Sequence, residues 1–254
     1  MPVSVMPAGG GAVPRGYLHI AAAVEPTLGR TPLPRNSPRK AELLRNLSVL
    51  AGQVSAETGA QAAVFSARLI TPGNRAGGRR HAAPARYDVA VLLEINDLDG
   101  LEQLQDHSQV RALVGAVTDA AAEVLVMPAR CVRTIADVDR SRPGLFLFNY
   151  FNGPDPERTL DAWQRVVAWY ERETGLDNST LLGPVTAGPF TLVNHARWDV
   201  GLPRLAARQF LRPSFRRDIL GVLAEARVRS QPIFFKLVST TAPAGAHLPA
   251  KGAR

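Results

Sequence analysis

Two segments of the chain begin and end in the same way, and this duplication constrains the fold more than any other feature. Ser37-Pro38 precedes an apolar stripe that ends at Glu57-Thr58-Gly59, and Asp155-Pro156 precedes a second stripe that ends at Glu173-Thr174-Gly175. Ser and Asp are favoured helix N-caps, Pro suits the first helical position, and Gly commonly ends a helix. The pattern predicts two similar helices at equivalent places in two repeated units.

The segments that flank the two helices repeat as well. Each helix follows a predicted strand and precedes two more strands, a second helical stretch and a closing strand led by proline. The predicted first-half segments are 16–24, 62–71, 87–95, 98–124 and the strand from Pro128; those of the second half are 145–151, 180–186, 190–198, 202–223 and the strand from Pro232. Each half therefore has the order β-α-β-β-α-β, which is the ferredoxin-like order of an α+β fold.

One ferredoxin-like unit leaves one face of its sheet without a cover. An apolar sheet face exposed to water is unfavourable, so two such units in one chain are expected to cover each other. The sequence predicts a flexible arm (1–15), a first unit (16–136), a polar linker (137–143), a second unit (144–240) and a flexible tail (241–254). The segment 73–86, rich in Gly and Arg, is predicted to be a long hairpin loop, with an anion clasp as the alternative.

Composition excludes several classes of protein. A single cysteine, Cys131, excludes an internal disulfide and zinc sites built on clustered thiolates, which favours a reducing, cytoplasmic setting. No apolar run approaches the length of a membrane span, so no membrane partner is expected. The formal charge of +8 comes mainly from Arg and can favour an anionic ligand. No nucleic-acid-binding motif accompanies this charge, so no nucleic-acid partner is expected.

A local pattern follows the third strand of each half. Leu101 and Leu104 precede a His/Ser break at 107–111, and Leu202 and Leu205 precede a Pro/Ser break at 212–216. With the order of elements, this pattern resembles a tandem form of the dimeric α+β barrel superfamily, which includes antibiotic biosynthesis monooxygenases, stress-responsive barrel proteins and polyketide cyclases. The resemblance implies an intramolecular barrel and an apolar cavity, either between sheet and helices or inside the barrel, suited to a small hydrophobic or aromatic molecule.

The resemblance also implies candidate catalytic residues. Anthrone-oxidising members carry Asn and Trp four residues apart on the third strand and an Arg on the next helix; Asn194 and Trp198 match this spacing, and Arg216 or Arg217 would be the Arg. These enzymes use no metal or flavin, because a substrate carbanion reacts directly with oxygen. Asn would hold a substrate oxygen, Trp would form a wall and Arg would stabilise enolate charge. The alternative is a core Trp beside a hydrogen-bonded Asn.

Other candidates lie on neighbouring strand positions. His195 alternates with Asn194 and is either a general base or a buried structural histidine. His19 lies on the first strand, where polyketide cyclases of the superfamily can carry a His. Asn149 matches the Asn of haem-degrading relatives, but the helix after Trp198 has no His to bind iron. Tyr150 is either a general acid or a packed aromatic.

The second unit is therefore expected to carry the cavity, and the first to act as its built-in partner. All three tryptophans lie in the second half. The predicted function is that of a small tailoring enzyme, a cofactor-independent oxygenase or a cyclase, acting on an aromatic polyketide-like intermediate. The alternative is a non-catalytic barrel that binds a hydrophobic molecule or a protein partner. The sequence leaves open whether this internal pseudo-dimer forms a further homodimer.

Overall fold

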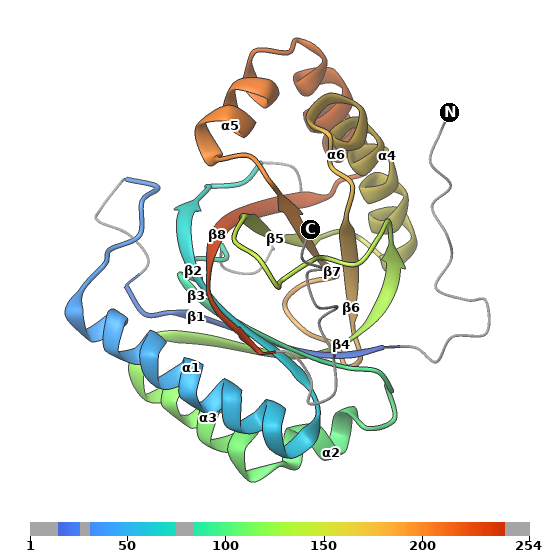
Figure 1. Cartoon of the computed structure of the whole chain (residues 1–254). Coiled ribbons are helices and arrows are strands. Elements are labelled where there is room, and N and C mark those ends of the chain that lie inside the picture. The colour runs from blue at the N-terminus through green and yellow to red at the C-terminus, as the bar shows by residue number, and fades with distance from the viewer. Residues whose placement is uncertain (1–14, 26–30, 75–83, 242–254) are drawn as a thin grey trace, which may run out of the picture.

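The computed structural model describes residues 15–25, 31–74 and 84–241 (Figure 1). The predicted arm and tail lie outside these ranges, apart from Arg15 and Thr241. Most of the predicted hairpin loop 73–86 lies outside them too. None of the described helices is long and apolar enough to cross a membrane.

Eight antiparallel strands close into a barrel in the order β1-β3-β2-β8-β5-β7-β6-β4. The first unit supplies β1 to β4 and the second supplies β5 to β8, so the pairs β2–β8 and β4–β6 join the two units. The strands are β1 (Gly16–Ala23), β2 (Gln61–Ile70), β3 (Val89–Ile95), β4 (Glu123–Thr134), β5 (Leu145–Asn152), β6 (Ser179–Pro184), β7 (Leu192–Trp198) and β8 (Arg229–Thr241). The predicted fold of two fused ferredoxin-like units is confirmed.

The helices of the two units lie on opposite sides of the barrel (Figure 1). They are α1 (Pro38–Thr58), α2 (Leu101–Asp106) and α3 (Ser108–Ala120) in the first unit, and α4 (Pro156–Thr174), α5 (Leu202–Phe210), the π-helical η1 (Arg216–Gly221) and α6 (Val222–Glu225) in the second. The predicted caps of the two long helices are confirmed: Ser37 accepts from Lys40 N, and Asp155 accepts from Arg158 N.

Several predicted boundaries are wrong. The helical stretch 98–124 breaks at His107 and ends at Ala120, and β4 then begins at Glu123 instead of Pro128. Similarly, β8 begins at Arg229 instead of Pro232. Proline lacks an N–H, and both prolines lie just beyond the point where a second neighbouring strand stops pairing. Each proline therefore lies within its strand at an edge-like position, where the missing donor costs little.

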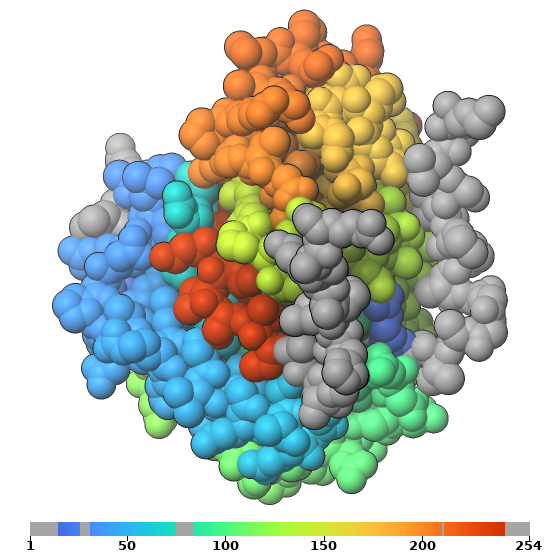
Figure 2. Space-filling model, in the orientation of Figure 1, coloured from blue at the N-terminus to red at the C-terminus, as the bar shows by residue number. Residues whose placement is uncertain are grey.

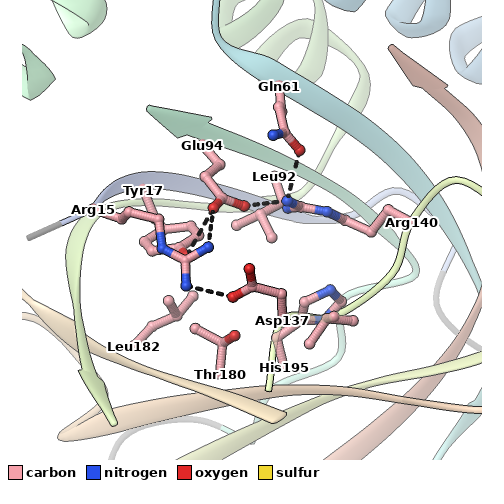
Figure 3. Close-up of a pocket in the computed structure, with 11 residues that line it drawn as sticks. Arg15, Tyr17, Gln61, Leu92, Glu94, Asp137, Arg140, Thr180, Leu182 and His195 are labelled. Carbon is pink, nitrogen blue, oxygen red and sulfur yellow. Dashed lines mark hydrogen bonds and ion pairs between the residues drawn. The ribbon is translucent and has the colours of Figure 1, made fainter. Parts of the chain in front are cut away.

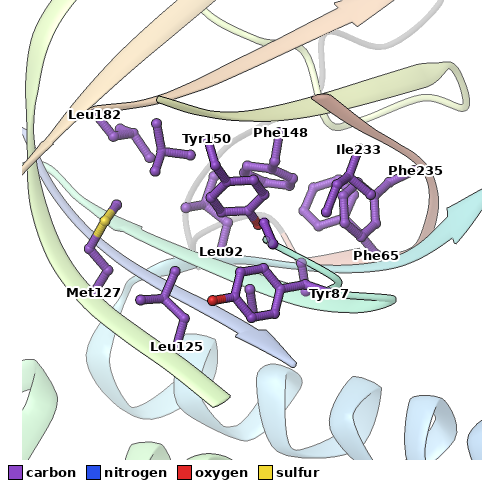
Figure 4. Close-up of a cluster of buried hydrophobic side chains, with 14 of the residues drawn as sticks. Phe65, Tyr87, Leu92, Leu125, Met127, Phe148, Tyr150, Leu182, Ile233 and Phe235 are labelled. Atoms are coloured by element: carbon purple, nitrogen blue, oxygen red, sulfur yellow. The ribbon is translucent and has the colours of Figure 1, made fainter. Parts of the chain in front are cut away.

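Aromatic and aliphatic side chains fill the inside of the barrel (Figure 4). Phe65 packs edge-on against Phe148 and Phe146, with ring centroids 5.3 and 5.2 Å apart. Successive residues of a strand point to opposite faces, so residues next to each other in sequence lie either in this interior or under the helices. The sheet thus separates the barrel interior from the space under the helices. A candidate residue can contribute to only one of these two regions.

Candidate functional site

A cavity of about 730 Å³ lies between the sheet of the second unit and its helices. Its floor is the helix-facing side of β5, β7 and β8, and its roof comes from α4, α5 and the segment 215–224. Figure 2 shows this roof, with the α5 segment in orange beside α4 in yellow. The aromatic side chains that line the cavity are Phe151, Trp163, Tyr170, Trp198, Phe215 and Phe234. A cavity of this size and character suits a small apolar molecule.

Two carboxamides lie side by side on the cavity floor. Asn149 of β5 is directly opposite Asn194 of β7, and both side chains are buried and line the cavity. Directly opposed residues of antiparallel strands have Cβ atoms roughly 4.5–5.5 Å apart. The two side chains can therefore contact the same part of one ligand.

Hydrogen bonds determine which atom of each amide remains free for a ligand. Trp163 Nε1 donates to Asn194 Oδ1 at 3.0 Å, and Ser179 Oγ donates to the same oxygen at 2.6 Å. An indole N–H can only donate, so the Asn194 atom it contacts is the oxygen. Ser230 Oγ donates to Asn149 Oδ1 at 2.9 Å. Among the described residues nothing accepts a hydrogen bond from either amide nitrogen, so both are available to a ligand oxygen.

The matching position in the first unit is apolar. The amides are the fifth residue of β5 and the third of β7, and the corresponding residues of β1 and β3 are Ile20 and Val91, which also face each other. Ile20 and Val91 are fully buried in the core beneath α1 and α3. Two aliphatic side chains are thus sufficient for folding at this position, whereas burying amide groups without hydrogen-bond partners is unfavourable. The amide pair therefore indicates binding or chemistry.

Trp198 and Tyr170 form a wall beside the amides. Trp198 Nε1 donates to Thr174 Oγ1 at 3.0 Å, which fixes the indole, and its ring lies 6.0 Å from that of Tyr170. Tyr170 lines the cavity, and its hydroxyl has no hydrogen-bond partner among the described residues. Burial raises the pKa of Tyr170 above its ordinary value, so the phenol stays neutral and can donate to a ligand.

The donor set of this cavity does not fit a metal centre. Its described lining contains no Asp, Glu, His, Cys, Met or Lys. Elsewhere in the described ranges, no three His, Cys, Asp or Glu side chains group as metal ligands. Haem iron is held by His, Cys, Met or Tyr, and Tyr170 is the one such residue in the described lining.

The other predicted candidates of the sheet lie inside the barrel. His195 and His19 both stack on Phe148, with ring centroids 4.3 and 4.5 Å away, and His19 Nε2 lies 3.0 Å from the Tyr150 hydroxyl. Burial lowers the pKa of His19 to about 3 and that of His195 well below its ordinary value, while it raises the pKa of Tyr150. Because the sheet lies between them and the cavity, these residues do not contact a ligand held by Asn194.

The two predicted arginines lie on the surface. Arg216 and Arg217 are exposed on η1, neither lines the cavity, and Arg217 forms an ion pair with Asp218. The structure therefore brings together Asn149, Asn194 and Trp198, and leaves the arginines outside.

Charged side chains form a hydrogen-bonded network around a second, smaller pocket (Figure 3). Around a small pocket of about 80 Å³, Glu94 accepts hydrogen bonds from Arg15 at 3.0 Å, from Tyr17 at 3.1 Å and from Arg140, and Arg15 also pairs with Asp137. The positive charges of the two arginines balance the negative charges of the two carboxylates. Ion pairs thus hold the segment that carries Asp137 and Arg140 to Arg15 and Glu94.

Sequence reasoning missed part of the site. Trp163 and Tyr170 belong to the apolar stripe between Asp155-Pro156 and Glu173, which the sequence predicts only as a packing face, and Gly73 and Asn74 belong to the predicted hairpin loop 73–86. All four residues line the cavity. A sequence signal was available. The apolar stripe of α4 carries two aromatic residues with a polar group, Trp163 and Tyr170, and the strand face that this helix covers carries two amides.

Comparisons with known proteins support the fold. No family model matches the chain, and no curated protein matches it significantly. Among solved structures, an anthrone oxidase-like protein superimposes with a TM-score of 0.64 at 11% identity, covering 97% of this chain and 100% of its own. Proteins provisionally assigned as monooxygenases, from Fusobacterium nucleatum and Lactobacillus acidophilus, give TM-scores of 0.54 and 0.50, each at 8% identity. Both matches cover 91% of this chain, and 95% and 97% of their own.

Proposed function

We propose that this chain, which has the dimeric α+β barrel fold, is an oxygenase that oxidises an aromatic polyketide-like substrate of the anthrone type without a bound cofactor. The observation that carries the proposal is the buried pair of amide donors, Asn149 and Asn194, on the floor of an apolar cavity. The fold similarity to an anthrone oxidase-like protein and to monooxygenases agrees with it.

The amide pair would act on the charge that develops in the reaction. Loss of a proton from the methylene carbon of an anthrone places negative charge on its carbonyl oxygen, and the two NH2 groups would donate hydrogen bonds to that oxygen. Their directions are fixed before the ligand binds, since Trp163, Ser179 and Ser230 hold the amide oxygens. Preorganised donors of this kind typically change kcat by about 100- to 1000-fold.

The reaction balances with molecular oxygen alone as the oxidant. One O₂ converts the methylene carbon to a carbonyl: one oxygen atom enters the product, and the other leaves as water with the two methylene hydrogens. The described cavity lining has no side chain that acts as a base at neutral pH. Ionisation would therefore be driven by stabilisation of the anion, and the proton would pass to water.

The cyclase alternative has less support. The two histidines that would act as its acid or base lie on the far side of the sheet with lowered pKa values. The non-catalytic alternative predicts binding without turnover, so a kinetic measurement separates it from the proposal.

The test is oxygen uptake by the purified chain with dithranol, a hydroxylated anthrone, as the probe. The proposal predicts saturable uptake of one O₂ for each dithranol converted to the quinone, above the spontaneous rate. Binding of the quinone to the cavity without any catalysed uptake would overturn the proposal in favour of a binding protein.

A further inference from the structure

A segment of the first unit forms one wall of the cavity in the second unit. This strap, residues 71–74, leaves the end of β2 beyond its last pairing with β8, between Ile70 and Ile233. Figure 1 shows the chain rising from β2 toward α5. Thr71 donates to the Pro232 carbonyl through both its N–H, at 3.3 Å, and its Oγ1, at 2.7 Å. The strap thus continues the contact between units after regular strand pairing ends.

Asn74 fastens the end of the strap to the start of β8. Its N–H donates to Ser230 O at 3.1 Å, its Oδ1 accepts from Ser230 N at 2.9 Å, and its Nδ2 donates to Val228 O at 3.1 Å. The preceding Gly73 has φ 72° and lies so close to β8 that a Cβ there would be 2.5 Å from Ser230 O. Both observations show a close fit between the strap and Ser230.

Ser230 in turn holds one of the two amides. Its Oγ donates to Asn149 Oδ1 at 2.9 Å, and both side chains are buried. Since Asn74 bonds both backbone polar groups of Ser230, it fixes the place from which that hydroxyl reaches Asn149. The hydrogen bonds therefore run from Asn74 of the first unit, through Ser230, to the amide of Asn149.

We propose that Asn74 is a positioning residue, which sets the direction of the Asn149 amide through Ser230, so that the first unit completes the site of the second. This inference rests on the proposed function for its kinetic consequence. Its structural content, the direction of the amide, does not depend on any reaction.

The direct test is the side-chain amide signal of Asn149 in the ligand-free protein, recorded by ¹H–¹⁵N NMR and assigned by its loss in Asn149→Ile. We expect Asn74→Ala and Ser230→Ala to shift this signal in the same direction, and Ser230→Thr, which keeps the hydroxyl, to leave it near its wild-type position. Asn152→Ala is the matched control, because Asn152 fastens β5 to the Pro189 carbonyl and does not line the cavity. An unchanged Asn149 signal in folded Asn74→Ala would overturn the inference.

Kinetics with dithranol give the second readout. We expect Asn74→Ala and Ser230→Ala each to lower kcat by about fivefold with KM within about twofold, and the double variant to be no worse than either, because both act through one contact. Raised KM with unchanged kcat would mean that Asn74 only shapes the wall, which contradicts the inference. If the wild type shows no turnover, the proposed function fails, and the NMR result still decides the role of Asn74.

Discussion

At the scale of single residues, the site depends on which atom of an amide faces a ligand. The oxygens of Asn149 and Asn194 each accept hydrogen bonds from neighbouring side chains, which leaves the amide nitrogens free to donate to a ligand. Asn194 has two such donors, the Trp163 indole and the Ser179 hydroxyl. Removing one donor from an amide oxygen weakens the preference for the productive orientation without changing the cavity's apolar character.

Trp163→Phe tests this dependence. The change removes the indole donor and keeps most of the apolar surface, so kcat should fall by about tenfold while KM changes little. Trp169→Phe is the matched control, because Trp169 lies on the same helix, donates to Ser214 Oγ and does not line the cavity. Equal kcat values for the two variants would contradict the role given to Trp163.

Two buried histidines predict how stability depends on pH. Burial lowers the pKa of His19 to about 3 and that of His195 well below its ordinary value, so the unfolded chain binds more protons than the folded chain below pH 6.5. The free energy of unfolding should therefore fall as the pH falls from 6.5 toward 4, by about 1.4 kcal/mol per pH unit for each histidine. Urea unfolding at several pH values measures this, and His195→Phe should make the slope shallower. A slope unaffected by that substitution would contradict the assignment.

At the scale of elements, helix caps hold the roof of the cavity. The Asp155 side chain accepts a hydrogen bond from Arg158 N at 2.8 Å at the start of α4, the helix that carries Trp163 and Tyr170. Gly175, at φ 73°, ends the same helix in a left-handed conformation. These local signals fix where α4 begins and ends, and thus which of its side chains face the amides.

Asp155→Ala should therefore destabilise the protein. Loss of an N-cap side chain costs about 1 kcal/mol, so the midpoint of urea unfolding should decrease, while Asp155→Asn, which can still accept the bond, should stay close to wild type. An alanine variant as stable as the wild type would show that the cap contributes nothing here.

Elements with strong local signals were predictable from sequence. Capped helices, strand alternation and the opposite faces of Asn194 and His195 follow from residue patterns alone, whereas Asn149, Asn194 and Trp198 became candidates through the resemblance to the barrel superfamily. The start of β4 could not be predicted from sequence. A proline is tolerated inside a strand only where no neighbouring strand needs its missing N–H, and at Pro128 that depends on where β6 stops pairing. The strap and the Trp163 bond were also out of reach, since both join residues far apart in the chain whose distance only the folded barrel sets.

At the scale of the whole molecule, the two units complete each other. The pairs β2–β8 and β4–β6 close the barrel around one shared core, to which both units contribute aromatic residues such as Phe65 and Phe148. Neither half can bury this face alone. The first unit also supplies the strap, so the cavity of the second unit depends on both halves.

Chains cut within the linker test this dependence. Residues 1–140 and 141–254, made separately, should each self-associate or precipitate, and on co-expression they should form a one-to-one complex, because exposed apolar sheet faces associate. Sedimentation velocity measures the outcome. A stable, folded monomer of either half would contradict the shared core.

The central claim is that the amide pair makes one of two similar units a catalyst. The most direct measurement is the rate of oxygen uptake with dithranol by the double variant Asn149→Ile/Asn194→Val, which gives the second unit the residues that the first unit already accommodates at Ile20 and Val91. The account predicts a folded protein with a Tm at least equal to that of the wild type and catalysed uptake reduced by about 100-fold or more. Wild-type uptake by this variant would contradict the account.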